Sequence, residues 1–166
     1  LRHFEARFPM QLASYMSLPW PRWDGRWVET LMSIPDQGLG DVLSFARFVP
    51  MAAARVGTLI LQVQPELVKL LADALSYVPN VRVVPQDRVI EHADAWCPAF
   101  SLPGALGLTD AEIRDATWPL LPVKPVEDRS WKRVGARLHV AVAWAGAPGN
   151  GIDMHRSIPF VEFLAL

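Results

Sequence analysis

The chain contains little of what marks disulfide-rich, membrane-spanning or nucleic-acid-binding proteins. Its single cysteine, Cys97, excludes an internal disulfide, which suits a reducing compartment and predicts a cytoplasmic protein. No apolar stretch approaches the roughly 20 residues of a membrane-spanning helix. The net charge of -1 gives no electrostatic reason to bind nucleic acid or an anionic membrane. We therefore expect neither a membrane span nor a nucleic-acid partner.

Ligand patterns for metals and dinucleotides are also missing from the sequence. The 4 histidines are scattered and accompany a lone cysteine, so they do not form the spacing of a zinc site. Gly38 and Gly40 begin a G-x-G-x-x-G pattern, but Leu43 occupies the position of the third glycine. A nicotinamide-dependent oxidoreductase is therefore disfavoured, and we expect no metal and no cofactor.

The composition is that of an ordered globular domain. Of the 166 residues, 51% are hydrophobic and 20% are charged, which is enough apolar material for the core of one ordinary domain. The chain starts at Leu1 rather than at a methionine, and Ser157–Leu166 resembles a helix that has just begun. We therefore expect the chain to be part of a longer protein.

From residue 27 onward, apolar runs alternate with amphipathic segments. The apolar runs predict strands at Trp27–Ile34, Thr58–Val63, Val81–Val84, Ala93–Pro98 and Leu138–Trp144. The amphipathic segments predict helices at Asp41–Val56, bent at Pro50 and ended by Gly57, at Pro65–Ser76, at Leu102–Gly107, and after an N-cap at Thr109. This alternation requires crossover connections, so we expect an α/β fold with a mostly parallel sheet and helices on both faces.

The stretch Ile34–Asp41 joins the first expected strand to the first expected helix. Gly38 and Gly40 stand where the chain has to reverse direction, and glycine permits positive φ angles because it has no Cβ atom. The helix N-terminus that follows exposes unpaired N–H groups at the carboxyl edge of the sheet, where open α/β folds bind ligands. We therefore expect a ligand site at this turn.

Residues 1–25 are the least regular part of the chain. The segment Leu18–Gly25 is expected to be a linker, because its prolines lack the N–H groups needed for ladder hydrogen bonds. Trp20 and Trp23 are expected to pack against the domain rather than to line a ligand site. A second glycine-rich loop, Ala145–Gly151, follows the last expected strand.

Several spaced motifs resemble the glycosyltransferase domain of bacterial tetratricopeptide-repeat proteins. In chain order they are Asp36-Gln37-Gly38-Leu39-Gly40-Asp41 with Phe45–Pro50, Ser101-Leu102-Pro103, Trp144-Ala145-Gly146, and Asp153 with Arg156-Ser157-Ile158-Pro159. The match covers almost the whole chain from Trp23 onward, and Phe4–Phe8 resembles the last repeat helix before such domains. More distantly, the motifs are similar to the ADP-heptose heptosyltransferases of lipopolysaccharide synthesis. Pro35 and Ala147 depart from the residues usual in the family.

The resemblance implies the N-terminal half of a truncated two-domain GT-B glycosyltransferase with Rossmann-like domains. Residues 26–125 would form the acceptor-side domain, and residues 126–166 the connector and first β-loop-α unit of the donor-binding domain. The implied activity is transfer of a sugar from a nucleotide-sugar donor to a hydroxyl of a protein or glycan acceptor. The sequence has no Asp-X-Asp triplet, which favours the metal-independent type. The isolated fragment is expected to be inactive, and its uncovered strand Leu138–Trp144 is open to self-association.

The resemblance also assigns roles to individual residues. Asp41 matches the catalytic aspartate, and Gln37, Gly38 and Gly40 would bind substrate beside it. The donor would be held by Gly146, Asp153, Arg156 and Ser157, with Arg156 on the diphosphate. From spacing alone, a helix N-cap is the favoured interpretation of Asp41 and a surface arginine is the default interpretation of Arg156; the resemblance puts a catalytic role for Asp41 level with the cap. A non-catalytic binding module therefore stays open as the alternative function.

Overall fold

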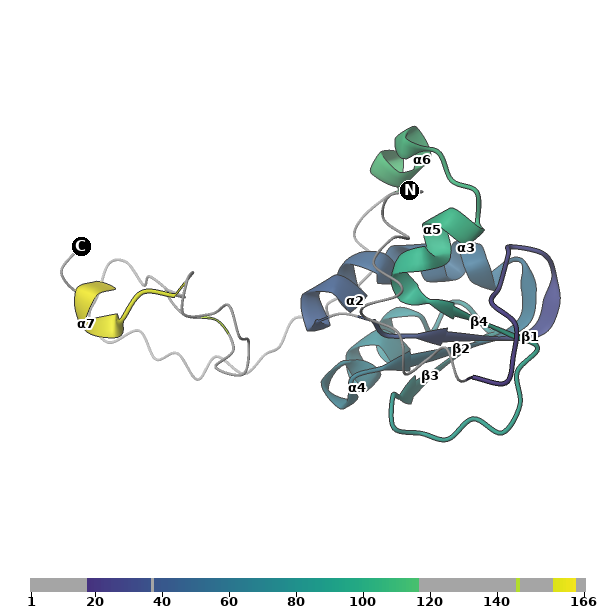
Figure 1. Ribbon diagram of the computed structural model, residues 1–166, viewed down its shortest axis with the longest axis horizontal. Coiled ribbons are helices and arrows are strands. Elements are labelled where there is room, and N and C mark those ends of the chain that lie inside the picture. Colours follow the sequence, from purple (N-terminus) through teal and green to yellow (C-terminus); the bar gives the residue numbers. More distant parts are fainter. Residues whose placement is uncertain (1–17, 37, 117–145, 147–156, 164–166) are drawn as a thin grey trace. The chain divides into compact units, whose positions relative to one another are not determined.

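The computed structural model describes residues 18–36, 38–116, 146 and 157–163 (Figure 1). The chain divides into two units, Leu1–Lys124 and Pro125–Leu166. The first contains a sheet with its helices, and the second contains the short helix α7 (Phe160–Phe163). The expected strand Leu138–Trp144 lies outside the described residues. No helix in the described part of the chain has the length and apolar character needed to cross a membrane.

The first unit is built on a four-stranded parallel sheet with the order β3-β2-β1-β4. Its strands are β1 (Val28–Ile34), β2 (Val56–Val63), β3 (Val81–Pro85) and β4 (Ala95–Pro98). Each expected strand of this unit is present, with ends shifted by one or two residues. The parallel sheet with its helices confirms the α/β, Rossmann-like fold class.

The side chains of the sheet alternate between two apolar clusters. Leu31 of β1 and Leu59 of β2, which are register partners, belong to the larger cluster. Met32 and Ile34 of β1 point the other way and belong to the smaller one. This period of two is the signature of a strand, so the two clusters mark the two faces of the sheet.

The larger cluster is completed by the helices that follow β1 and β2. These are α2 (Leu39–Phe45), the 3-10 turn η3 (Ala46–Phe48), α3 (Val49–Ala53) and α4 (Pro65–Ala74). The buried side chains Val42, Phe48 and Leu71 all belong to this one cluster. The connections from β1 to β2 and from β2 to β3 run in the same direction along the sheet. Right-handed connections then place their helices on the same face of the sheet.

One long helix, Asp41–Val56, was expected where the structure has α2, η3 and α3. The helix is interrupted by η3, which ends two residues before Pro50. Pro50 lies in the first turn of α3, where its missing N–H costs no hydrogen bond. Gly57, expected to end the helix, lies inside β2 instead. The apolar residues of this region fit both the helical spacing and the alternation of a strand, so the sequence did not show where the helix ends and the strand begins.

The segment after β4 forms three short helices. They are η4 (Ala99–Ser101), α5 (Leu102–Ala105) and α6 (Asp110–Asp115). The capping box expected at Thr109 is present: the Glu112 N–H donates to Thr109 Oγ1, and the Glu112 carboxylate accepts from the Thr109 N–H at 2.8 Å.

The smaller cluster is covered by non-helical segments in the described part of the chain. Leu18, Trp20 and Ile90 pack against Met32, Ile34, Ala93 and Trp96. The connection from β3 to β4, where a doubly wound fold carries a helix, contains only turns and extended chain. The described helices therefore cover one face of the sheet, whereas helices on both faces were expected.

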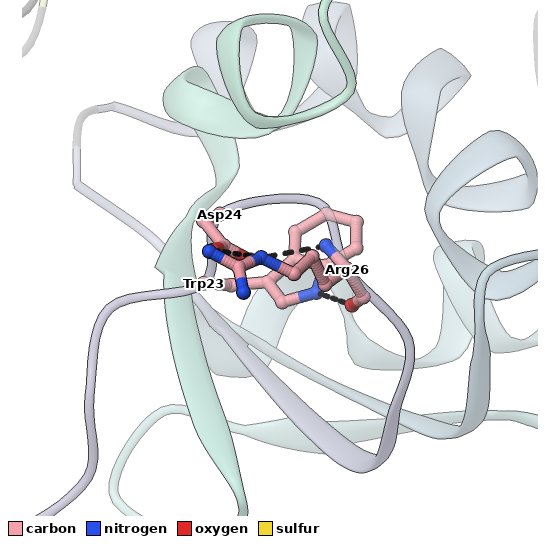
Figure 2. Close-up of polar contacts among 3 residues, drawn as sticks. All are labelled: Trp23, Asp24 and Arg26. Atoms are coloured by element: carbon pink, nitrogen blue, oxygen red, sulfur yellow. Dashed lines mark hydrogen bonds and ion pairs between the residues drawn. The ribbon is translucent and has the colours of Figure 1, made fainter.

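The residues from Pro21 to Trp23 extend the sheet edge, which corrects the expectation of a linker. The Trp23 N–H donates to the Trp96 carbonyl at 2.8 Å, and the Trp96 N–H donates to the Pro21 carbonyl at 3.0 Å. A proline lacks the N–H but keeps its carbonyl acceptor, so Pro21 can take part. As expected, Trp23 packs into the core, and Figure 2 shows its indole N–H donating to the Arg26 carbonyl at 2.7 Å.

Candidate functional site

The turn at residues 35–41 lies at the topological switch point of the sheet. β1 is flanked by β2 on one side and by β4 on the other, and the register pairs Ile34 with Pro98 at the carboxyl ends of β1 and β4. The loops leaving these two strands therefore start side by side. In open α/β sheets, ligands bind in the crevice outside the carboxyl ends at such a point.

The loop after β1 enters α2 through an exposed stretch. Gly38 is the N-cap residue of α2, and its carbonyl accepts from the N–H groups of Asp41 and Val42, both at 3.1 Å. Gly38, Leu39, Gly40 and Asp41 are all exposed, whereas Pro35 is buried. Gln37, expected to bind substrate, lies outside the described residues.

The structure corrects the reason given for the two glycines of this turn. Gly38 has φ -67° and ψ 171°, an extended conformation that any residue adopts, and Gly40 lies within α2. The positive-φ glycines in the described part of the chain are Gly25 and Gly107. The turn therefore needs no glycine for its backbone angles.

Steric crowding by the protein does not explain these glycines either. Among the described residues, a Cβ atom built on Gly40 meets no atom within 4 Å, and one on Gly38 meets only Asp41 Oδ2 at 3.6 Å, an ordinary contact. By contrast, a Cβ atom on Gly57 would lie 2.7 Å from the Glu29 carbonyl oxygen. The fold thus requires a glycine at position 57 but not at 38 or 40, although a helical glycine costs about 0.5 to 1 kcal/mol relative to alanine.

Asp41 lies in the first turn of α2, not at its N-cap. The N-cap is Gly38, and no side chain caps the helix. The capping explanation for Asp41 is therefore wrong, because α2 begins two residues earlier than expected. The Asp41 side chain is exposed and makes no hydrogen bond or ion pair with the described residues. Its charge is favourable near the N–H groups of the first turn.

The β4 side of the switch point is formed by η4. The Phe45 and Phe100 rings pack edge to face with centroids 4.1 Å apart, which joins α2 to η4. Ser101 is buried, and its Oγ accepts a hydrogen bond from Arg22 Nη2 at 2.9 Å. Sequence reasoning missed Arg22, and no local signal reveals it, because its partner is 79 residues away.

The second unit brings two of the expected donor-site residues together. The Gly146 N–H donates to Ser157 Oγ at 3.0 Å, and Ser157 lies three residues before α7. The other two expected donor residues, Asp153 and Arg156, lie outside the described residues.

A shallow groove of about 440 Å³ lies elsewhere in the first unit, between α3 and α6. It does not include the switch-point residues, and its walls are formed by Arg47, Pro50, Met51, Tyr77, Glu112, Asp115 and Ala116. In the part of the chain that the structure describes, no cluster of three or more His, Cys, Asp or Glu side chains is arranged to hold a metal ion. No protein-family model, curated protein or solved structure matches the chain.

Proposed function

We propose that the chain contains the acceptor-side domain of a metal-independent glycosyltransferase. The reaction would transfer a sugar from a nucleotide-sugar donor to a hydroxyl of a protein or glycan acceptor. The order and spacing of the motifs support this proposal, as does the α/β fold with its first motif at the switch point. A fold alone does not give a function, so the proposal depends on the residues at the turn.

One observation carries the proposal: the turn presents an exposed carboxylate beside glycines that the fold does not require. Asp41 is exposed and has no partner among the described residues, and its Oδ2 lies over Gly38. A general base has to reach within about 2.6 to 3.2 Å of the proton it removes. A surface without Cβ atoms lets a substrate approach both the backbone and this carboxylate closely.

The proposed chemistry assigns the proton transfer to Asp41. Its carboxylate takes the proton of the acceptor hydroxyl, and the oxygen forms a bond to the anomeric carbon of the donor sugar. The bond between that carbon and the nucleoside diphosphate breaks, and the diphosphate leaves with the electron pair. In this proposal Gly146 and Ser157 of the second unit contact the donor, together with Asp153 and Arg156.

Replacing Asp41 by asparagine in the full-length protein tests the proposal. The asparagine side chain cannot act as a base but has nearly the same shape, so the fold should be kept. We expect the release of nucleoside diphosphate from UDP-, GDP- and ADP-linked sugars, with acceptor present, to fall about 10²- to 10⁴-fold. The matched control is Asp110→Asn, an exposed aspartate in the first turn of α6.

Two outcomes would contradict the proposed function. Wild-type turnover in the Asp41→Asn variant would remove Asp41 from the chemistry. Binding of a nucleotide sugar without any transfer by the wild-type protein would favour the alternative, a non-catalytic binding module.

A further inference from the structure

The groove between α3 and α6 is a second candidate site of the first unit. Its volume of about 440 Å³ lies within the range of about 300 to 1,000 Å³ that is usual for binding pockets. Pro50 and Met51 of α3 and Ala116 at the end of α6 contribute to its walls. Ile113 and Ala116 also pack against the larger apolar cluster, so α6 lies on the same side of the sheet as α3 (Figure 1).

The groove leaves large apolar side chains in contact with solvent. Met51 is 39% exposed, and Tyr77, which lies three residues after α4, is 61% exposed. Most of the surface that lines the groove is apolar. Exposed apolar residues that are scattered singly are normal, whereas exposed apolar residues gathered in a groove are typical of a binding surface.

Two carboxylates line the same groove. Glu112 and Asp115 are three residues apart on α6, so their side chains are neighbours on one face of the helix. The hydrogen bonds from the Thr109 N–H and hydroxyl both end on Glu112 Oε2, which leaves Oε1 without a donor among the described residues. Asp115 is exposed and makes no hydrogen bond or ion pair with the described residues. Both carboxylates can therefore accept hydrogen bonds from a ligand.

One cationic residue also lines the groove, but it is partly buried. The Arg47 guanidinium lies over the ring of Phe48, 4.8 Å from its centroid, and Phe48 is fully buried. The Arg47 Nε atom is buried as well. The groove thus combines two exposed carboxylates with one partly buried cation, and this balance favours a cationic ligand over an anionic one.

We propose that the groove binds an arginine side chain presented by a partner protein. The aliphatic part of an arginine side chain covers apolar surface, here that of Pro50 and Met51, while its charged head stays hydrated. The guanidinium can stack on the Tyr77 ring and donate two parallel hydrogen bonds to a carboxylate, a geometry that a lysine ammonium lacks. This site is separate from the switch point and does not depend on sugar transfer.

The direct test is an NMR titration of the full-length protein with capped amino acids. The probe is N-acetyl-arginine amide, and its neutral control is N-acetyl-citrulline amide, which has nearly the same shape. We expect saturable shifts of the Met51, Tyr77 and Ala116 amide signals with the arginine probe, and at least about 5-fold weaker binding of the citrulline control. The arginine affinity should also fall as the salt concentration rises.

Three results of this titration would overturn the proposal. The first is the absence of a saturable shift with the arginine probe. The second is equal or tighter binding of the citrulline control, or of N-acetyl-glutamate amide, at the same signals. The third is a shift of these signals with protein concentration in the absence of any probe, which would assign the groove to a second copy of the chain.

Matched variants then assign the binding to the groove. Asp115→Asn keeps the shape of the side chain but removes its charge, so it should weaken arginine binding about 5-fold. Tyr77→Leu keeps an apolar side chain without the aromatic face, so it should weaken binding about 2- to 5-fold. The control is Asp110→Asn, because Asp110 is an exposed aspartate of the same helix that is not among the groove residues. Unchanged binding in both groove variants, or an equal loss in the control, with unfolding temperatures close to that of the wild type, would contradict the proposal.

This proposal and the proposed function fail in different ways. Arginine binding in the groove of a protein that transfers no sugar would contradict glycosyl transfer and keep the groove as an interaction site. Sugar transfer by a protein whose groove signals ignore the arginine probe would contradict the interaction site and keep the proposed function.

Discussion

Replacing Gly40 by alanine should make the protein more stable and less active. Gly40 is helical and exposed, and a Cβ atom at this position meets none of the described residues within 4 Å, so the methyl group fits them without strain. Alanine is favoured over glycine by about 0.5 to 1 kcal/mol inside a helix, and about 0.5 kcal/mol is expected near a helix end. For a domain of this size the unfolding temperature should then rise by about 2 to 4 °C.

The same methyl group should obstruct the substrate if the turn is a binding surface. It would add bulk at the exposed residue that precedes Asp41 in the first turn of α2, and a misplacement of about 1 Å at a reacting centre can reduce turnover about 100-fold. We expect kcat/KM for sugar transfer in the full-length protein to fall at least about 10-fold, measured by nucleoside diphosphate release. Thermal unfolding of the same sample provides the stability measurement.

Two control variants separate this effect from a general effect on α2. Ser44→Ala changes an exposed residue of the same helix, away from its first turn, and should stabilise the protein without loss of activity. Gly57→Ala should destabilise it, because the new Cβ atom would crowd the Glu29 carbonyl. A Gly40→Ala protein that is more stable and fully active would refute the claim that a substrate needs the space at position 40.

Two further predictions concern stability. Ser33→Ala should leave the free energy of unfolding unchanged or raise it by about 1 kcal/mol, measured by urea titration. The reason is that Ser33 is fully buried and its hydroxyl has no hydrogen-bond partner in the described part of the chain. A clear loss of stability would mean that the hydroxyl is hydrogen-bonded. The pKa of Glu112 lies below its ordinary value of 4.5 because its carboxylate accepts hydrogen bonds from the Thr109 N–H and hydroxyl. The carboxylate of Glu112 should therefore stabilise α6 fully above that ordinary pKa, and this stabilisation should be lost as the pH falls through the lowered pKa. We expect faster amide hydrogen exchange in α6 at low pH, and Glu112→Gln should remove this pH dependence.

The elements with a clear apolar period could be predicted from the sequence. In the helix after β2, the helical spacing of the leucines in the sequence predicts one buried side formed by Leu67, Leu70, Leu71 and Leu75. Leu67, Leu71 and Leu75 are buried, whereas Leu70 is 38% exposed. Successive residues turn by about 100°, so Leu70 lies at the margin of the face defined by Leu67 and Leu71. Periodicity fixes the centre of a buried face better than its edges.

The contacts that form the β4 side of the candidate site could not be predicted in this way. Arg22 and Ser101 meet only because β4 pairs with β1, and Pro21–Trp23 then pairs with β4. The prolines of the segment suggested a linker because proline lacks the N–H that a strand donates. The sequence did not show that the Pro21 carbonyl would accept a hydrogen bond from Trp96. Side-chain pairs that depend on strand order are available only once the topology is known.

The glycines of the turn show that the reason given for a prediction can be wrong while the prediction itself stays untested. Gly38 and Gly40 were expected to bind substrate, and their glycine identity was attributed to positive φ angles, which the structure does not show. Without that reason, and without a crowded Cβ position, nothing in the described part of the chain favours glycine over alanine at position 40. Positions where local preference and structure disagree are expected at functional sites, because function can favour a residue that the fold does not. The disagreement at Gly40 therefore strengthens the case for a substrate at this turn, since a glycine required by the backbone would have carried no information about one.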